Sequence, residues 1–196
     1  MIRFFGLLLF FVNSLTLNAQ TSKYVLQKEQ AKEAFNYLNK VRLKPSDFKN
    51  EIGYFMKSIK PKHELKWDKI LVEVAEEKAM DMAKKNYFNH VSKEGKGINV
   101  MIHKAGYELN SDWIKDKKDN SFESISAGAE TAVESIINLI IDKNVKGLGH
   151  RKHLLGMNDW YGMMKDIGIG FVSCLNTDNT YNTYCCVIIA THDWED

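Results

Sequence analysis

Two stretches near the end of the chain, Ile167-Gly-Ile-Gly-Phe-Val172 and Tyr184-Cys-Cys-Val-Ile-Ile-Ala190, decide the fold class. Both are rich in β-branched and aromatic residues, and polar turns bound them, which is typical of strands. They predict an antiparallel hairpin in which residues 168–175 and 181–189 flank the polar turn 176–180. The chain therefore ends in a small sheet.

Five helical segments are predicted before this hairpin. Residues 29–41 carry apolar side chains at helical spacing, and Asp68 is a suitable N-cap for a second helix. The buried face predicted for that second helix comprises Leu71, Val74, Ala75, Ala79, Met82 and Ala83. Further helices are expected over 98–105, 130–141 and 150–155. Helices first and a hairpin last predict an α+β fold, with helices packed on a small antiparallel sheet.

Residues 1–19 are typical of a secretory signal peptide. Arg3 precedes an apolar run over 4–12, and a polar stretch then leads to Ala19, a small residue suited to signal-peptidase cleavage. The run is shorter than the about 20 apolar residues needed to cross a bilayer. We therefore expect a secreted or periplasmic protein without a transmembrane anchor after cleavage, its single domain spanning 20–196.

The charge of the expected mature chain is nearly balanced. The formal net charge of +2 falls to +1 when Arg3 is removed, and basic and acidic residues are interspersed, as over 115–119. Domains that bind nucleic acid concentrate basic residues in a stripe or patch. The sequence therefore predicts no nucleic-acid partner.

All three cysteines lie in the predicted hairpin. Export permits a disulfide, and the hairpin is expected to bring Cys174 opposite Cys185 or Cys186, within bonding range. The alternative is three reduced, buried thiols. No CxxC pair occurs, so a thiol-based zinc or redox site is not expected.

Three short motifs contain candidate site residues. His90 follows the second helix, where a histidine can simply interact with the helix dipole. His150 and His153 are three residues apart, so they either share a helical face and hold a metal or are two surface histidines. In the third motif, Glu123-Ser-Ile-Ser-Ala-Gly128, an acidic residue precedes a short strand-like segment that ends in glycine. Taken alone, this motif does not indicate a function.

In their order and spacing these motifs resemble the CAP superfamily, which comprises cysteine-rich secretory proteins, antigen 5 and plant pathogenesis-related proteins and shares an SCP-like extracellular domain. Bacterial members are the most similar. The resemblance runs from Ala34-Phe-Asn-Tyr-Leu-Asn-Lys-Val-Arg42 to Ile167-Gly-Ile-Gly-Phe171 and covers nearly the whole mature chain. It implies a three-layer α-β-α sandwich.

The resemblance also implies a cleft in which two histidines and two acidic residues converge. Carried over to this sequence, they are His90, Glu123, Asp142 and His150. Asp142 stands where Glu is more familiar and reaches one C–C bond less far. Ser124 replaces the usual Asn, which is expected to loosen the hold on the backbone of its motif. His153 has no counterpart and is interpreted as a residue on the surface or behind the cluster.

Two classes of function follow from the resemblance and the residues. The first is a non-catalytic extracellular binding domain whose cleft recognises a peptide, a partner protein or a lipid-like molecule. The alternative is a metal-dependent hydrolase or peptidase, in which His90 and His150 bind Zn²⁺ or another divalent metal and Glu123 is the general base. In that case His153 or Asp142 would have to supply a third ligand. A third hypothesis is that the cluster only ties the helices to the sheet.

Overall fold

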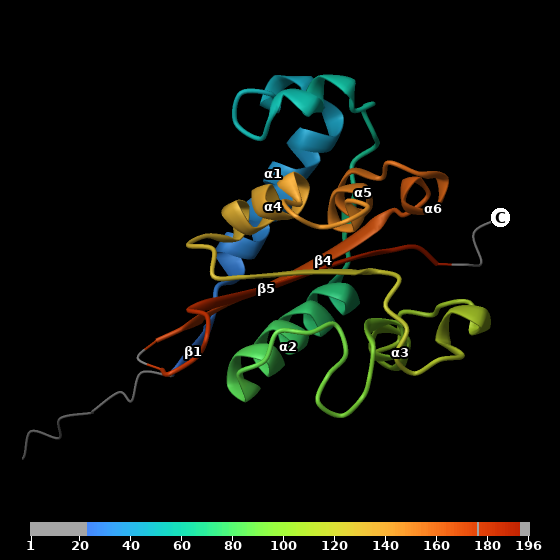
Figure 1. The fold of residues 1–196 in the computed structure, drawn as a ribbon. Coiled ribbons are helices and arrows are strands. Elements are labelled where there is room, and N and C mark those ends of the chain that lie inside the picture. The colour runs from blue at the N-terminus through green and yellow to red at the C-terminus, as the bar shows by residue number, and fades with distance from the viewer. Residues whose placement is uncertain (1–22, 176, 193–196) are drawn as a thin grey trace, which may run out of the picture.

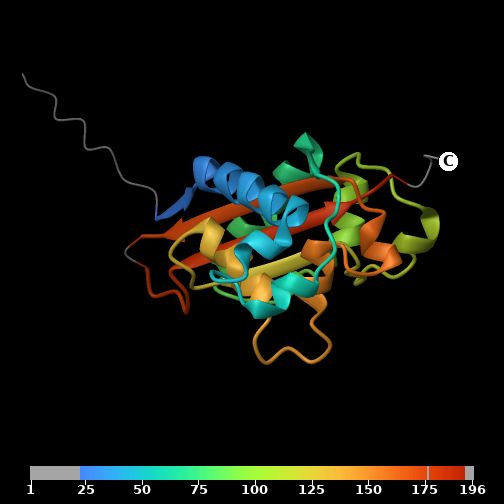
Figure 2. The same ribbon diagram turned by 90° about the horizontal axis from the view of Figure 1, so that it is seen from above.

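The computed structural model describes residues 23–175 and 177–192, which form three layers (Figure 1). The expected signal peptide over 1–19 lies outside the described residues. One helical layer covers each face of a central sheet, so the predicted α-β-α sandwich is confirmed. Seen from above, the first helix lies across the long strands of the sheet (Figure 2).

The central layer is a five-stranded sheet in which four strands follow the order β1-β4-β5-β3. The strands are β1 (Tyr24–Leu26), β2 (Lys66–Trp67), β3 (Glu123–Ala127), β4 (Asp166–Cys174) and β5 (Thr183–Ala190). All pairings are antiparallel except that of β2, which joins β4 in parallel. The predicted hairpin is β4 and β5, and every residue of β5 is buried because helices cover both faces.

The five predicted helices are all present. They are α1 (Lys28–Leu43), α2 (Lys69–Lys85), α3 (Ile98–Lys104), α4 (Ala132–Ile141) and α5 (Gly149–Leu155). The structure adds the short α6 (Asp159–Gly162) and three 3₁₀ turns, η1 (Pro45–Phe48), η2 (Tyr54–Ser58) and η3 (Ser111–Ile114). Helices α2 and α3 lie on one side of the sheet, and α1, α4 and α5 lie on the other (Figure 1).

Helix α2 is the main cover of its side of the sheet. The Asp68 side chain accepts a hydrogen bond from the Leu71 backbone N–H at 2.9 Å, which confirms the predicted N-cap. All six residues of the predicted buried face are buried. The helix packs on β4 and β5, where Gly168 and Gly170 let the two backbones come close together.

Helix α1 anchors the other helical layer, which comprises α1, α4 and α5. Asn39 exchanges hydrogen bonds of 3.0 and 2.9 Å with the backbone of Leu65. The buried guanidinium of Arg42 donates to the carbonyl oxygens of His63 and Leu154, the latter at 2.7 Å. Because Leu154 belongs to α5, this contact fixes the helix that carries two of the histidines.

The predicted cross-strand cysteine pair is wrong. The register of β4 and β5 places Cys185 opposite Phe171 and Cys186 opposite Gly170, while the Cys174 backbone N–H bonds to Asn182. The register ends with Ser173 opposite Thr183, so position 182, not 185, faces Cys174. All three cysteines are free and buried, which is the alternative that the sequence left open.

The buried thiols should be unreactive in the native domain. Burial raises the pKa of Cys185 to about 12, and burial together with the nearby Glu123 raises that of Cys186 well above its usual value. Since the thiolate is the reactive form, a disulfide-exchange reagent such as Ellman's reagent should label these two only after urea is added. Rapid labelling of either in native buffer would contradict this burial.

Candidate functional site

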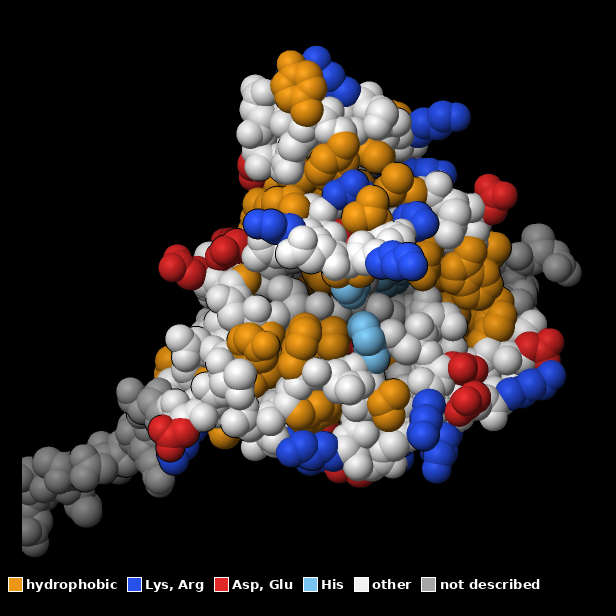
Figure 3. All heavy atoms as spheres, in the orientation of Figure 1, with side chains coloured by type: hydrophobic (Ala, Val, Ile, Leu, Met, Phe, Trp, Pro, Cys, Tyr) orange, Lys and Arg blue, Asp and Glu red, His pale blue; other side chains and the backbone are white. Residues whose placement is uncertain are grey.

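The four residues that the resemblance brings together meet on one face of the molecule. The imidazole rings of His90 and His150 are stacked, with centroids 6.2 Å apart and planes inclined by 26°. His90 comes from the loop after α2 and His150 is the second residue of α5, so the pair bridges the two helical layers. Figure 3 shows histidine side chains in a hollow at the centre of this face, beside a group of hydrophobic side chains.

Each histidine is held by a buried carboxylate. His90 Nδ1 donates to Glu123 Oε2 at 2.7 Å, and His150 Nδ1 donates to Asp142 Oδ1 at 2.7 Å. The acidic side chains are 0% and 1% exposed, whereas the two histidines are 37% and 24% exposed. With Nδ1 bonded to an acceptor, Nε2 is the atom that each ring offers to solvent or a ligand.

The loop between α4 and α5 is fixed from both ends. Asp142 takes a left-handed conformation (φ 51°) at the end of α4, and its Oδ2 accepts hydrogen bonds from the backbone N–H groups of His150 and Arg151. Arg151 in turn donates to the carbonyl oxygens of Ile140 and Ile141 at the end of α4. This reciprocal capping brings the shorter Asp142 side chain within reach of His150.

Lys78 holds the loop that carries His90 from the interior of the domain. This lysine of α2 is completely buried, and its Nζ donates to the carbonyl oxygens of Asn89 and His90, both at 2.8 Å. Helix α2 ends at Lys85, with Asn86 as its left-handed C-cap. His90 therefore does not cap the helix, and it owes its position to the lysine beneath it.

Sequence reasoning missed Lys78, although a signal was present. It lies four residues after Val74 and four before Met82, at a position that the helical spacing assigns to the buried face of α2. A lysine is almost never fully buried unless it is paired. A charged residue on the apolar face of a strongly amphipathic helix is therefore the pattern that points to a buried polar contact.

Replacing Lys78 by Met should destabilise the domain by about 2 to 4 kcal/mol, because the carbonyl oxygens of Asn89 and His90 lose the buried donor that they share. Lys69→Met on the exposed side of the same helix is the matched control and should change stability by less than about 0.5 kcal/mol. Urea unfolding of both variants measures the difference. Equal stabilities would show that the lysine does not hold the His90 loop.

The structure decides between the two interpretations of His153, a residue on the surface or one behind the cluster, in favour of the second. It is not a surface residue: it is 2% exposed and lies behind β3, where its Nδ1 is 2.7 Å from Ser124 Oγ. Its Nε2 is 3.4 Å from the carbonyl oxygen of Ile189. Ser124 therefore does not loosen its motif, since it ties β3 to α5. With both ring nitrogens engaged in the interior, His153 is not available to share a metal with His150.

Both carboxylate oxygens of Glu123 contact neighbouring side chains. Oε2 accepts from His90, while Oε1 is 3.5 Å from the Cys186 thiol. Its side chain has no exposed surface. The carboxylate can orient His90 but does not face a space in which substrate or water would lie.

The histidine pair could supply two ligands to a metal through the Nε2 atoms. Zn²⁺ in catalytic sites usually has three protein ligands. Within residues 23–175 and 177–192, no group of three or more His, Cys, Asp or Glu side chains is arranged to hold a metal ion. The donor set therefore fits a weakly held ion at most, with its other ligands from solvent or a bound molecule.

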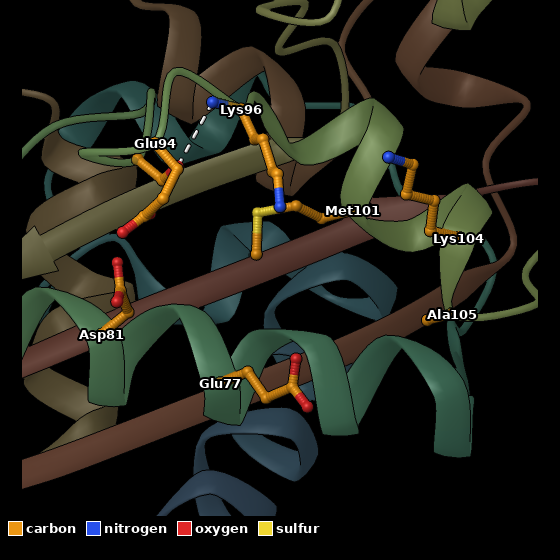
Figure 4. Close-up of a pocket in the computed structure, with 8 residues that line it drawn as sticks. Glu77, Asp81, Glu94, Lys96, Met101, Lys104 and Ala105 are labelled. Carbon is orange, nitrogen blue, oxygen red and sulfur yellow. Dashed lines mark hydrogen bonds between the residues drawn. The ribbon is translucent and has the colours of Figure 1, made fainter.

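A cavity of about 450 Å³ lies between α2 on one side and α3 with the loop before it on the other (Figure 4). It is lined by mixed charges, and two of its acidic residues, Asp81 and Glu94, form ion pairs with Lys85. None of the lining residues is a histidine. The cavity thus lacks the chemistry of the histidine pair, and its size does not make it the better candidate.

Comparison with known families identifies the family to which the chain belongs. The model of the cysteine-rich secretory protein family, CAP, matches residues 35–188. The chain belongs to this family. The match contains all four residues of the cleft, so the CAP domain extends over both helical layers. A search of curated proteins gave no match.

Solved structures support the fold of this CAP domain. An outer surface protein of Borrelia burgdorferi is 18% identical with a TM-score of 0.53, over 85% of this chain and 96% of its own. An extracellular SCP-domain protein of Bacillus anthracis is 19% identical with a TM-score of 0.51, over 84% of this chain and 41% of its own. Among the described residues, no helix has the length and apolar character needed to cross a bilayer.

Proposed function

We propose that this CAP domain is an exported, non-catalytic binding domain whose histidine cleft recognises an extracellular peptide or protein. The observation that carries the proposal is that the acids and the histidines of the cleft have different positions and roles. Both acids are buried and bonded to imidazole Nδ1 atoms, while only the Nε2 edges of the two histidines are presented outward. Such a site offers hydrogen-bonding edges to a ligand and no activated nucleophile.

Export is part of this proposal. The pattern of residues 1–19 supports it, as does the extracellular or outer-surface description of the two structural neighbours. Expression in a bacterial host with the natural N-terminus, followed by mass spectrometry of the exported product, should find a chain that begins at Gln20.

The alternative, a metal-dependent hydrolase with Glu123 as general base, has weaker support. A general base must come within hydrogen-bonding distance of the proton that it removes, directly or through one water. The Glu123 side chain has no exposed surface, and its two oxygens are engaged by His90 and Cys186. A lipid-like ligand is also less favoured, because the groove beside the histidines has only about 230 Å³, less than the about 300–1,000 Å³ of most small-molecule sites.

Selection from a random peptide library tests the binding function. Wild-type mature domain should enrich peptides that the His90→Ala/His150→Ala double variant fails to enrich, provided that circular dichroism shows equal folding. The result that would contradict the proposal is equal enrichment by both proteins.

Calorimetric titration with Zn²⁺ separates the two functions. With only two imidazole ligands, the wild-type domain should bind far more weakly than structural zinc sites, whose binding free energies are about 10–16 kcal/mol. The double variant should lose this binding. Zn²⁺-dependent cleavage of a fluorogenic peptide pool that Glu123→Gln abolishes would instead favour the hydrolase.

A further inference from the structure

A shallow groove adjoins the histidine pair and extends along the outer edge of the sheet. It has a volume of about 230 Å³, and its lining includes His150, Ile125 and Ala127. Helix α4 packs on β3 and runs back along it after a short connection. The end of α4, with Asp142 and Lys143, therefore lies at the Glu123 end of the strand, where the histidines meet.

The edge of β3 in this groove has unused backbone groups. The Ile189 N–H donates to the Phe122 carbonyl and the Gly128 N–H donates to that of Thr183, so residues at even positions from 122 to 128 point their backbone groups toward β5. In an antiparallel ladder the alternate residues then point their N–H and C=O groups outward. Ile125 and Ala127 are such residues, and within the described residues no hydrogen bond to their outward groups is found.

Apolar side chains form the walls of the same groove. Phe88, Val145 and Tyr181 are three of the eight large hydrophobic residues that are exposed in the described part of the chain, and all three line it. The Phe88 and Tyr181 rings pack edge to face at 5.8 Å. An aromatic wall beside a strand edge provides pockets for the side chains of an added strand.

The histidine end of the groove carries an accessible positive charge. At the histidine end, the only acid in the lining, Asp142, is buried and bonded by His150, whereas Lys143 is exposed and has no ion-pair partner among the described residues. The accessible charge at this end is therefore positive. It complements a carboxylate, such as the one that ends a peptide chain.

We propose that the groove binds the C-terminal segment of an extended peptide as an additional strand, antiparallel to β3. The peptide residue opposite Ile125 exchanges two backbone hydrogen bonds with it, an apolar side chain packs on Phe88 and Tyr181, and the C-terminal carboxylate lies near Lys143 and the histidine pair. This inference rests on the proposed function and names its ligand class. Edge strands are the usual site of such addition, and β3 carries no lysine or proline to prevent it.

The test uses octapeptides with free C-termini, selected on the mature domain. The most enriched peptide is synthesised as the free acid, as the C-terminal amide, and with N-methyl groups on either of two alternating sets of backbone amides. Fluorescence anisotropy should show at least about tenfold weaker binding for one N-methyl set and less than about threefold for the other, because only alternate amides face β3. The amide should bind about tenfold more weakly than the acid.

Variants of the domain provide a second readout. Ala127→Pro removes one outward N–H at an edge position where proline is tolerated, and it should weaken binding, whereas Lys69→Met, on the exposed side of α2 and outside the groove, should bind as the wild type does. The N-methyl pattern needs no protein variant, so the test stands even if Ala127→Pro fails to fold. Equal effects of both N-methyl sets, unchanged affinity of folded Ala127→Pro, or no enriched peptide would overturn strand addition.

The outcomes also separate this inference from the function on which it rests. Binding that the His90→Ala/His150→Ala variant loses, but that shows no alternating N-methyl effect, would keep the histidine cleft and reject strand addition. An alternating effect that persists unchanged in the double variant would keep strand addition and reject the role of the histidines.

Discussion

Replacing Gly170 by Ala should destabilise the domain by more than about 4 kcal/mol or prevent folding altogether. A Cβ at this position would lie 2.2 Å from the carbonyl oxygen of Ala75 and 2.3 Å from its carbonyl carbon. These are backbone atoms in the middle of α2, so no side-chain rotation relieves the clash, and the whole helix has to move off β4. Because α2 also carries Lys78, the displacement would move the His90 loop as well.

Gly149→Ala is the matched control. Gly149 begins α5, its backbone is not left-handed, and a Cβ there would meet no atom within 4 Å. This substitution should leave stability within about 0.5 kcal/mol of the wild type or raise it slightly. Urea unfolding measures both variants. If Gly170→Ala lay within about 1 kcal/mol of the wild type, the close approach of α2 to β4 would not be the contact that fixes this layer.

The sequence predicted the helices and the terminal hairpin because their patterns are strong. Helix α2 combines an N-cap with an uninterrupted apolar face, and β5 is apolar at nearly every position, as a strand covered on both faces must be. The pairing of β1 and β2 with β4 was not predicted. These strands have three and two residues, too few for a periodicity to be recognised.

Which residues form the cleft was predicted only through the resemblance. His90 and Glu123 are 33 positions apart in the chain, and neither pattern alone indicates that the two side chains meet. His153, which contacts Ser124, shows a second limit of sequence reasoning: a pattern was present, but it did not predict which side chain is exposed. Spacing suggested that His153 shares the exposed face of α5 with His150, but α5 has two turns at most and its last turn is buried against β3 and β5. Tertiary packing decides which of the two histidines reaches solvent, and helical spacing alone does not predict that packing.

His153 should make the stability of the domain fall in acid. Burial, with smaller contributions from the positive groups of His150, Arg42 and His90, lowers its pKa to about 3, although its contact with the Ile189 carbonyl acts in the other direction. In the unfolded chain a histidine has a pKa of about 6.5. Between these two values the unfolded state binds a proton that the native state does not, so the free energy of unfolding decreases as the pH is lowered.

The slope of this decrease is about 1.4 kcal/mol per pH unit, which sums to roughly 4 kcal/mol between pH 6.5 and pH 3.5. His153→Gln keeps a polar side chain beside Ser124 and removes the titrating group. Urea unfolding at intervals from pH 7 to pH 4 should therefore show the wild type losing stability more steeply than the variant, whatever their difference at pH 7. Parallel curves would mean that His153 is protonated in the native state, and then the Ser124 hydroxyl would have to accept from its Nδ1 instead of donating to it.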